Sequence, residues 1–318
     1  MTDPGRARHY GEFYGLSGTS GADPRPLWLV VGNCQAEALR QMLDTVDDRP
    51  YRTVRVPPVH ELTIDDLPHL AGLLRQAAVL LSQPIRTDYR GLPLGTEQLI
   101  AAAAPATTVL RWPVIRYAGL YPFQVIVRRP ADRSVVPPPV PYHDLRTISA
   151  ALEGRTAKDP WDVEVEPARF RTVAEMSRST LAERERRDTD VGISDMLSSA
   201  GCDAAHAINH PGNTVLAALA DRILGALDVP THVTPADKPL LGSVYVPLEQ
   251  RVLAALELDG PGRARTQWCY DGTQLDPDWV HRVQMHWYLD NPDFLQLAVE
   301  RHRSTMDALG LPIGALHP

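Results

Sequence analysis

A cysteine follows a short apolar segment near the amino terminus, at the point where a helical pattern begins. The sequence WLVVGNCQAEALRQML, residues 28–43, places Cys34 between Asn33 and Gln35. A thiol in the first turn of a helix faces unpaired backbone N–H groups and the positive end of the helix dipole, and both favour the nucleophilic thiolate. The same N–H groups can stabilise an oxyanion after sulfur attacks a carbonyl. We predict that Cys34 is a nucleophile; the alternative is a small buried side chain, as free cysteines often are.

Polar residues beside this cysteine and after a later apolar segment are candidates for binding the reacting carbonyl. Gly32 would let the backbone approach a ligand closely, and Asn33 and Gln35 would add amide donors. Gln83, in LLSQPI, would either donate to a developing oxyanion or satisfy a turn. We therefore include these four residues in the predicted site.

A nucleophilic cysteine needs a base, commonly a histidine, within hydrogen-bond reach. His210, in AINHPGN, ends an apolar segment before a helical pattern, and a parallel sheet would bring it to the same edge as Cys34. Asn209 and Asn213 flank it and would orient the imidazole or a substrate. His143, in PYHDLR, is the second candidate base. Asp144 beside it would either orient the imidazole or cap the helical pattern that follows.

Arginines near predicted strand ends are candidates for binding a phosphate-bearing ligand, and these are Arg86, Arg111 and Arg116. No metal is expected, because His281 and His286 are five residues apart and do not share one face of a helix. The three cysteines contain no CxxC pair, so neither a disulfide framework nor a structural zinc site is expected.

Apolar segments that alternate with helical patterns predict the elements that position these residues. Strands are expected within 26–33, 51–59, 77–85 and 107–115, and helices within 35–46, 63–76 and 95–104. This alternation predicts an α/β fold with three layers, a parallel sheet flanked by helices. Ligands of such sheets bind at the carboxyl ends of the strands, where Cys34 and Gln83 lie.

The pattern changes along the chain and predicts three regions. Residues 1–25 are expected to form a flexible amino-terminal arm and 26–227 an α/β catalytic domain, with a proline-rich excursion or lid loop near 113–145. Residues 228–318 are expected to form a helical carboxy-terminal extension.

Composition excludes several functional classes. The net charge of -7 argues against a nucleic-acid or anionic-membrane surface. The sequence contains no apolar stretch long enough for a membrane span and no secretory signal, so we expect a soluble, cytoplasmic protein with reduced thiols. It also lacks the GxxxxGK[ST], GxGxxG and GxSxG motifs, which disfavours an NTPase, a dinucleotide enzyme and a serine hydrolase of the GxSxG type.

Four short motifs, GNCQ (32–35), SQPI (82–85), PYHD (141–144) and NHPGN (209–213), occur in order within residues 27–225. In these motifs the sequence resembles the WcbI-type capsule-polysaccharide biosynthesis proteins, acetyltransferases that bind coenzyme A. The resemblance implies an α/β fold, a coenzyme A site and acyl transfer, with the family's cysteine at Cys34 and its histidine at His210 or His143. The layout is also similar to that of SGNH-type hydrolases, with Cys34 in place of the serine, but the usual DxxH motif has no counterpart.

The resulting prediction is a coenzyme A-dependent acyltransferase that moves an acyl group from a thioester to a hydroxyl or amine of a sugar or small molecule. Acyl-coenzyme A would be the donor, and Cys34 would either carry the acyl group or line the site of a direct transfer. The alternatives are a cysteine-dependent thioesterase or esterase, and a non-catalytic coenzyme A- or glycan-binding protein. The sequence leaves open whether the protein forms a homo-oligomer.

Overall fold

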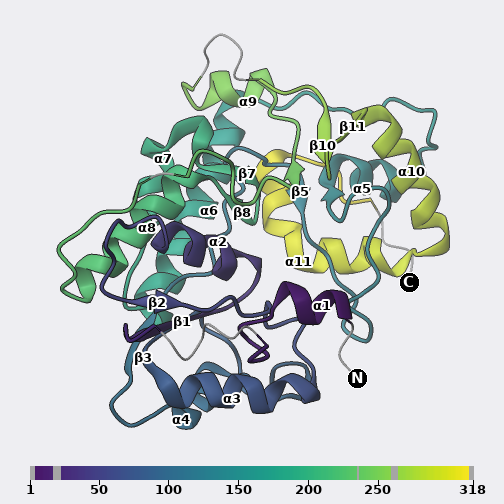
Figure 1. Ribbon diagram of the computed structural model, residues 1–318. Helices are drawn as coiled ribbons and strands as arrows, with labels where there is room; N and C mark the ends of the chain where they lie inside the picture. Colours follow the sequence, from purple (N-terminus) through teal and green to yellow (C-terminus); the bar gives the residue numbers. More distant parts are fainter. Residues whose placement is uncertain (1–3, 17–22, 235, 259–263, 315–318) are drawn as a thin grey trace. The chain divides into compact units, whose positions relative to one another are not determined.

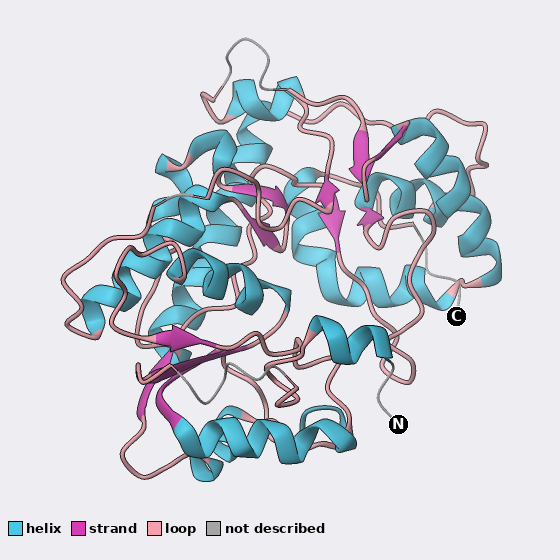
Figure 2. Cartoon of the chain, in the orientation of Figure 1, coloured by secondary structure: helices cyan, strands magenta, loops and turns pink. Residues whose placement is uncertain are grey.

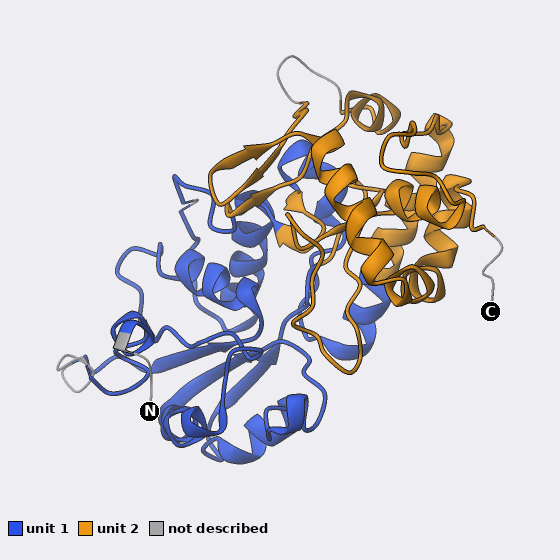
Figure 3. Cartoon of the chain, turned by 90° about the vertical axis from the view of Figure 1, so that its right-hand side faces the viewer, with its two compact units in different colours: residues 1–115, 181–204, 211–241 blue, residues 116–180, 205–210, 242–318 orange. Residues whose placement is uncertain are grey.

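The chain divides into two units, each assembled from separate stretches of sequence (Figure 3). The computed structural model describes residues 4–16, 23–234, 236–258 and 264–314. Unit 1 contains residues 1–115, 181–204 and 211–241, and unit 2 contains residues 116–180, 205–210 and 242–318. The units therefore do not follow the predicted boundaries at 26, 227 and 228, because the carboxy-terminal helices share a hydrophobic core with the middle of the chain.

Unit 1 is built around a parallel sheet of four strands in the order β2–β1–β3–β4 (Figure 1). The strands are β1 (Leu27–Val31), β2 (Arg52–Thr53), β3 (Ala77–Ser82) and β4 (Thr108–Arg111). Every side chain of β1 is buried, as expected for a strand covered on both faces. The second strand ends at Thr53, well before the predicted end at residue 59, which the ladder could not reach in any case because Pro57 and Pro58 have no N–H group.

Helices cover both faces of this sheet, which confirms the predicted α/β class (Figure 2). One face carries α2 (Cys34–Leu43) and α8 (Asn213–Ala226), and the other carries α3 (Leu67–Gln76) and α4 (Thr96–Ala102). Leu29 of β1 packs in one core with Leu70 and Leu74 of α3. The carboxyl end of β1 leads directly into α2, so the fold places Cys34 at the predicted strand-to-helix turn.

The amino terminus is not a loose arm over residues 4–14. It contains α1 (Pro4–His9), and Tyr10, Phe13 and Tyr14 are buried in the core of unit 1. The Tyr14 hydroxyl donates to Asp66 at 2.8 Å. The prediction of flexibility failed here because the Gly- and Ser-rich composition of residues 15–21 masked the aromatic residues before it; residues 17–22 lie outside the described residues.

Unit 2 is mainly helical and holds two small antiparallel sheets, β5–β6 and β11–β10–β9. Phe123, Ile148, Phe170 and Phe294 are members of its core. The proline-rich stretch from 113 to 145 supplies part of this core through Phe123, so it is not a lid loop as a whole. The elements of this unit include β5 (Gln124–Val125), β6 (His143–Asp144), α5 (Leu145–Leu152), β9 (Val244–Tyr245), α9 (Gln250–Ala255), β10 (Trp268–Tyr270), β11 (Thr273–Leu275), α10 (Pro277–Asp290) and α11 (Asp293–Leu309).

The remaining elements are short, apart from the charged helix α6. They are η1 (Ile64–Asp66), η2 (Tyr89–Gly91), α6 (Pro167–Asp188), α7 (Met196–Ser199), η3 (Gly201–Asp203), β7 (Ala205–Ala207) and β8 (His210–Pro211). Strands β7 and β8 form a two-stranded sheet of their own and do not extend the parallel sheet. The argument that strand topology brings His210 to the same sheet edge as Cys34 is therefore wrong.

Candidate active site at the Cys34 turn

Cys34 is the first residue of α2, and its partly exposed thiol is not in a disulfide. Asn33 is the N-cap, and its Oδ1 accepts a hydrogen bond from the Gln35 N–H at 2.9 Å. The side chain of Asn33 thus starts the helix that presents the thiol. The predicted location of Cys34, at a helix amino terminus beyond the end of a parallel strand, is confirmed.

The acidity of this thiol differs from the prediction. Burial raises the pKa of the Cys34 thiol, and the nearby negative charge of Glu61 raises it further. The backbone N–H groups of Cys34 and Gln35 lower this pKa, as the helix position predicts, but they do not outweigh burial. The expectation of an unusually acidic thiol is wrong in direction, so a base must remove the proton before the sulfur can attack.

Gln83 and Gln35 form a buried amide network that holds the turn in place. Gln83 Oε1 accepts the Asn33 N–H at 2.9 Å, and its Nε2 donates to Gln35 Oε1 at 3.1 Å. Gln35 Nε2 donates to the Ile115 carbonyl at 2.7 Å, while its Oε1 also accepts the Ile115 N–H at 3.0 Å. Both amide groups are committed to protein partners, so the predicted role of Gln83 and Gln35 as oxyanion donors is not supported; they position Cys34 instead.

Gly32 is required by this network. A Cβ atom at position 32 would lie 2.5 Å from Gln83 Oε1, closer than real contacts allow. The glycine therefore lets the Gln83 amide reach the Asn33 N–H, a more specific role than the predicted approach of a ligand.

Replacing Gln83 with leucine is expected to lower the free energy of unfolding by about 1–3 kcal/mol, because it leaves the Asn33 N–H without its partner and leaves Gln35 Oε1 with only the Ile115 N–H. Urea denaturation measures this loss. Gln76→Leu is the matched control, since the exposed Gln76 amide bonds only to Gly72 of its own helix. Equal stability of Gln83→Leu and wild type would contradict the positioning role.

The segment 59–61 also belongs to this turn and was missed by sequence reasoning. The Val59 N–H donates to the Gly32 carbonyl at 2.9 Å, so the exposed imidazole of His60 follows directly after a contact with the turn. His60 Nε2 lies 3.9 Å from Glu61 Oε1, and Glu61 is the carboxylate whose charge acts on Cys34. The signal that could have identified His60 and Glu61 was a histidine next to a glutamate directly after the predicted second strand, 51–59.

The residues around His210 have structural partners of their own. Asn213 donates to the carbonyls of Ala236 at 3.0 Å and Lys238 at 2.9 Å, and its Oδ1 accepts the Leu240 N–H. Asn213 therefore anchors the segment after α8, which does not support its predicted role in orienting a base. Asn209 Oδ1 accepts a hydrogen bond from the Tyr142 hydroxyl at 2.8 Å.

Two histidines with different surroundings were predicted as bases. His210 is 8% exposed and begins β8. His143 is fully buried, with its Nδ1 2.6 Å from the Tyr288 hydroxyl and its ring stacked on Phe294. Burial lowers the pKa of His143 to about 3, so the ring is neutral and a weak base at neutral pH. These surroundings indicate a structural role for His143.

The free energy of unfolding is expected to fall as the pH drops below about 6.5, because burial lowers the pKa of two histidines. The pKa of His143 is lowered to about 3 and that of His281 to about 4. Both rings are protonated in the unfolded chain below pH 6.5 but stay neutral in the folded chain. Each histidine should therefore lower the free energy of unfolding by about 1.3 kcal/mol between pH 7.5 and 5.5. Urea denaturation at several pH values measures the slope, which His143→Gln should reduce by its own share of about 1.3 kcal/mol and His286→Gln, at an exposed position, should leave unchanged. An unchanged slope in His143→Gln would contradict this account.

The three predicted phosphate-binding arginines, Arg86, Arg111 and Arg116, differ in whether they have a partner. Arg111 pairs with Glu97 at 2.8 Å, and the exposed Arg86 lies 6.0 Å from the Tyr89 ring. Arg116 and Arg128 both belong to unit 2, and neither pairs with a carboxylate among the described residues. Arg128 is half-buried, and its pKa is lowered by this burial and further by the positive charge of the exposed Arg116. Two neighbouring cations without acidic partners suit an anionic ligand.

Other kinds of site find no support in the described part of the chain. No group of three or more His, Cys, Asp or Glu side chains there could hold a metal ion. Among the described residues, no helix has the length and apolar composition needed to cross a membrane.

The parallel sheet and its helix-terminal cysteine define unit 1 as an α/β unit with a candidate thiol site. The chain belongs to the WcbI family, described as a polysaccharide biosynthesis enzyme, whose pattern matches residues 27–232. This match confirms the resemblance seen in the four sequence motifs.

A solved structure of a WcbI protein is similar in fold. It is described as a novel polysaccharide biosynthesis enzyme, in its native form without a disulfide bond between coenzyme A and one of its cysteines. It is 18% identical, with a TM-score of 0.72, and the match covers 90% of this chain and 98% of the other. No curated protein matches the sequence.

Proposed function

We propose that the protein is a coenzyme A-dependent acyltransferase of polysaccharide biosynthesis that acts through Cys34. The observation that carries this proposal is the thiol at the amino terminus of α2, held by the amide network of Gln83 and Gln35. A fixed thiol beside helix N–H groups is suited to attack a carbonyl and to stabilise the resulting oxyanion. The WcbI structure is described as the native protein without a disulfide bond between coenzyme A and one of its cysteines, and a bond of that kind joins a coenzyme A thiol to a nearby cysteine, which supports the proposed pairing of coenzyme A with Cys34.

Arg116 and Arg128 are the residues proposed to bind the phosphates of coenzyme A, because both lack a carboxylate partner among the described residues. Arg116→Gln should weaken coenzyme A binding about tenfold, the loss of roughly one charge-assisted hydrogen bond. Isothermal titration with coenzyme A measures this change. Arg133→Gln, at another exposed arginine of unit 2, is the control, and equal affinity in both variants would reject the assignment.

The proposed acyl transfer through Cys34 has two steps. A base takes the proton of Cys34, the sulfur attacks the thioester carbonyl, and the carbon–sulfur bond to coenzyme A breaks as the protonated base gives its proton to the leaving sulfur. An acceptor hydroxyl or amine then loses a proton to the free base and attacks the acyl group on Cys34, and the bond to Cys34 breaks as the base returns the proton to its sulfur. His210 was the base predicted from sequence, and His60 becomes a second candidate because it lies beside the Cys34 turn.

Direct transfer is the second candidate mechanism, favoured by the raised pKa of the Cys34 thiol. In this route the acceptor attacks the thioester itself, and Cys34 only lines the site. Water as the acceptor would make the protein a thioesterase, the function implied by an SGNH-hydrolase-like layout.

Acceptor dependence tests the proposed transferase. The protein is incubated with acetyl-coenzyme A, with and without a mixture of methyl glycosides, and both free thiol and acetylated glycoside are measured. We expect thiol release that rises with glycoside and matches the acetylated product. Release of acetate at a rate independent of glycoside would instead identify a thioesterase.

A further inference from the structure

The loop that contacts the Cys34 turn is bound by an arginine of the amino-terminal helix α1. Arg6 Nη2 donates to the Glu61 carbonyl at 3.0 Å, and Arg6 Nη1 lies 3.6 Å from Glu61 Oε2. The same guanidinium group pairs with the buried Asp66 at 3.0 Å. Arg6 therefore ties α1 to two points of this loop, the first of them only two residues after the Val59 N–H that donates to the turn.

A second arginine binds the residue before Glu61. Arg90 Nη1 donates to the His60 carbonyl at 2.8 Å. Arg90 has a φ of +56°, a left-handed conformation that is unfavourable for a residue with a Cβ atom and persists only where surrounding contacts hold it. The carbonyls of His60 and Glu61 are thus each bound by a different arginine, one from η2 and one from α1.

Helix α1 lies outside the part of the chain that the family pattern matches. That pattern begins at residue 27, whereas α1 ends at His9. No role of Arg6 therefore follows from membership of the family. Arg6 and the loop that it binds both belong to unit 1, the unit that contains Cys34.

Glu61 is the charged group of this loop that acts on the thiol. Burial raises the pKa of Cys34, and the negative charge of Glu61 raises it further. Glu37, one turn along α2, is instead paired with Arg40 at 2.7 Å and with Arg55 at 3.3 Å. The other titratable and charged groups near this loop are His9, Tyr10, Tyr14, His60, Asp66 and Arg90.

We propose that Arg6 is a positioning residue of the Cys34 site, which holds the Glu61 carboxylate beside the thiol and so keeps the sulfur protonated in the resting protein. The Glu61 side chain is 43% exposed, so without Arg6 it turns toward solvent, where water screens its charge from the sulfur. A protonated thiol is protected from alkylation and oxidation, because the thiolate is the form that reacts.

The rate at which iodoacetamide alkylates Cys34 in the full chain, measured from neutral to alkaline pH, tests the proposal. Peptide mapping by mass spectrometry follows each cysteine separately, so Cys202 and Cys269 in the same digest are internal references. The inference rests on the role of Cys34 in the proposed function. Alkylation needs neither coenzyme A nor an acceptor, however, so failure of this inference and failure of the acyl transfer are distinguishable.

The decisive comparison is the effect of Glu61→Gln with and without Arg6. In the wild-type chain we expect Glu61→Gln to move the pH profile of Cys34 alkylation to lower pH and to raise the rate at neutral pH about twofold, because a nearby negative charge is lost. In the Arg6→Gln chain, Glu61→Gln should leave the profile unchanged, since Glu61 is no longer held there. Arg8→Gln is the matched control, because Arg8 is exposed on the same helix and bonds to no residue of the loop among those described; in that chain Glu61→Gln should have its full effect.

The proposal is overturned if Glu61→Gln does not move the profile in the wild-type chain, or if it moves the profile as far or farther in the Arg6→Gln chain. It is equally overturned if the alkylation rates of Cys202 and Cys269 change in parallel, which would indicate a general loosening of the fold. Arg6→Gln takes a cation from the buried Asp66, so Arg90→Gln, which loses one exposed hydrogen bond, replaces it with the same expected result if that variant does not fold.

Discussion

Cys34→Ala is expected to lower the kcat/KM of acetyl transfer by roughly 10³-fold or more, because it removes the atom that attacks the thioester. The amide network of Gln83 and Gln35 contacts the backbone at this turn and not the sulfur, so the variant should fold like the wild type. A continuous assay of thiol release from acetyl-coenzyme A, supplied with the acceptor glycoside, measures the loss.

Cys269→Ala is the matched control, since this cysteine is also partly exposed but lies on β10 of unit 2. We expect it to keep the wild-type rate. Full activity of Cys34→Ala would remove the covalent route and leave direct transfer as the mechanism.

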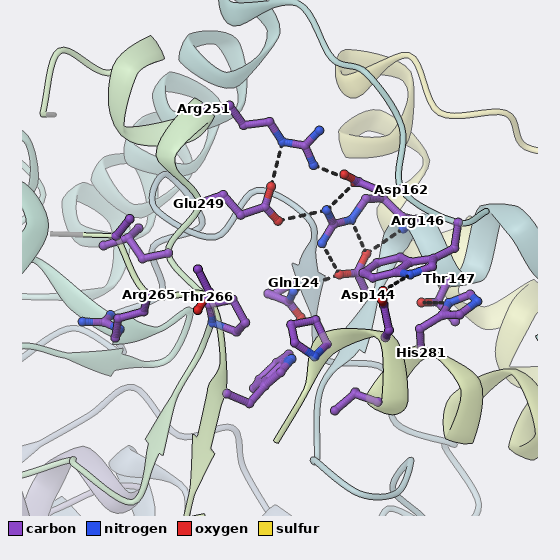
Figure 4. A pocket seen from close by; sticks show the side chains of 18 of the residues that line it. Gln124, Asp144, Arg146, Thr147, Asp162, Glu249, Arg251, Arg265, Thr266 and His281 are labelled. Atoms are coloured by element: carbon purple, nitrogen blue, oxygen red, sulfur yellow. Dashed lines mark hydrogen bonds and ion pairs between the residues drawn. The ribbon is translucent and has the colours of Figure 1, made fainter. Parts of the chain in front are cut away.

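The largest expected effect on stability is that of Arg146→Met, at about 3–5 kcal/mol. Arg146 is buried on α5 and pairs with Asp144, Asp162 and Glu249 (Figure 4). Its removal leaves the buried Asp144 without a cation and leaves Arg251 alone to pair with the other two carboxylates. The three carboxylates raise the pKa of Arg146, as expected for a cation that the fold stabilises. Urea denaturation at neutral pH measures the change.

Arg178→Met is the control for this effect. Arg178 pairs with Glu175 on the exposed surface of α6, where an ion pair contributes little, so its loss should leave the unfolding midpoint unchanged. A loss in Arg146→Met as small as that of Arg178→Met would show that the buried cluster does not hold unit 2 together.

Local patterns predicted much of unit 1. Strands β1, β3 and β4 and helices α2, α3, α4 and α8 fall where apolar periodicity placed them, and the cysteine lies at the predicted helix terminus. These features are determined by residues close together in the sequence, so the pattern of a single sequence is enough to predict them.

The roles of the amides around Cys34 were not predictable, because their partners are distant in sequence. Gln35 bonds to Ile115, 80 positions away, and Gln83 contacts Asn33, 50 positions away. The raised pKa of the Cys34 thiol has the same origin, since burial depends on how separate segments pack around it.

Unit 2 was the least predictable part of the fold. Its core joins Phe123 and Phe170 from the middle of the chain to Phe294 near the end, so it crosses the predicted domain boundary at 227. A cavity of about 500 Å³ in this unit is lined by residues as distant in sequence as Gln124 and His281 (Figure 4). Neither the division into units nor this cavity has a signature within any short stretch of sequence.

The intact mass of the protein after brief incubation with acetyl-coenzyme A and rapid acid quenching tests the central claim most directly. We predict that the wild type gains the mass of one acetyl group, that peptide mapping places it on Cys34, and that Cys34→Ala gains nothing. An unmodified wild type, together with a Cys34→Ala variant that still transfers acetyl at the full rate, would contradict the account.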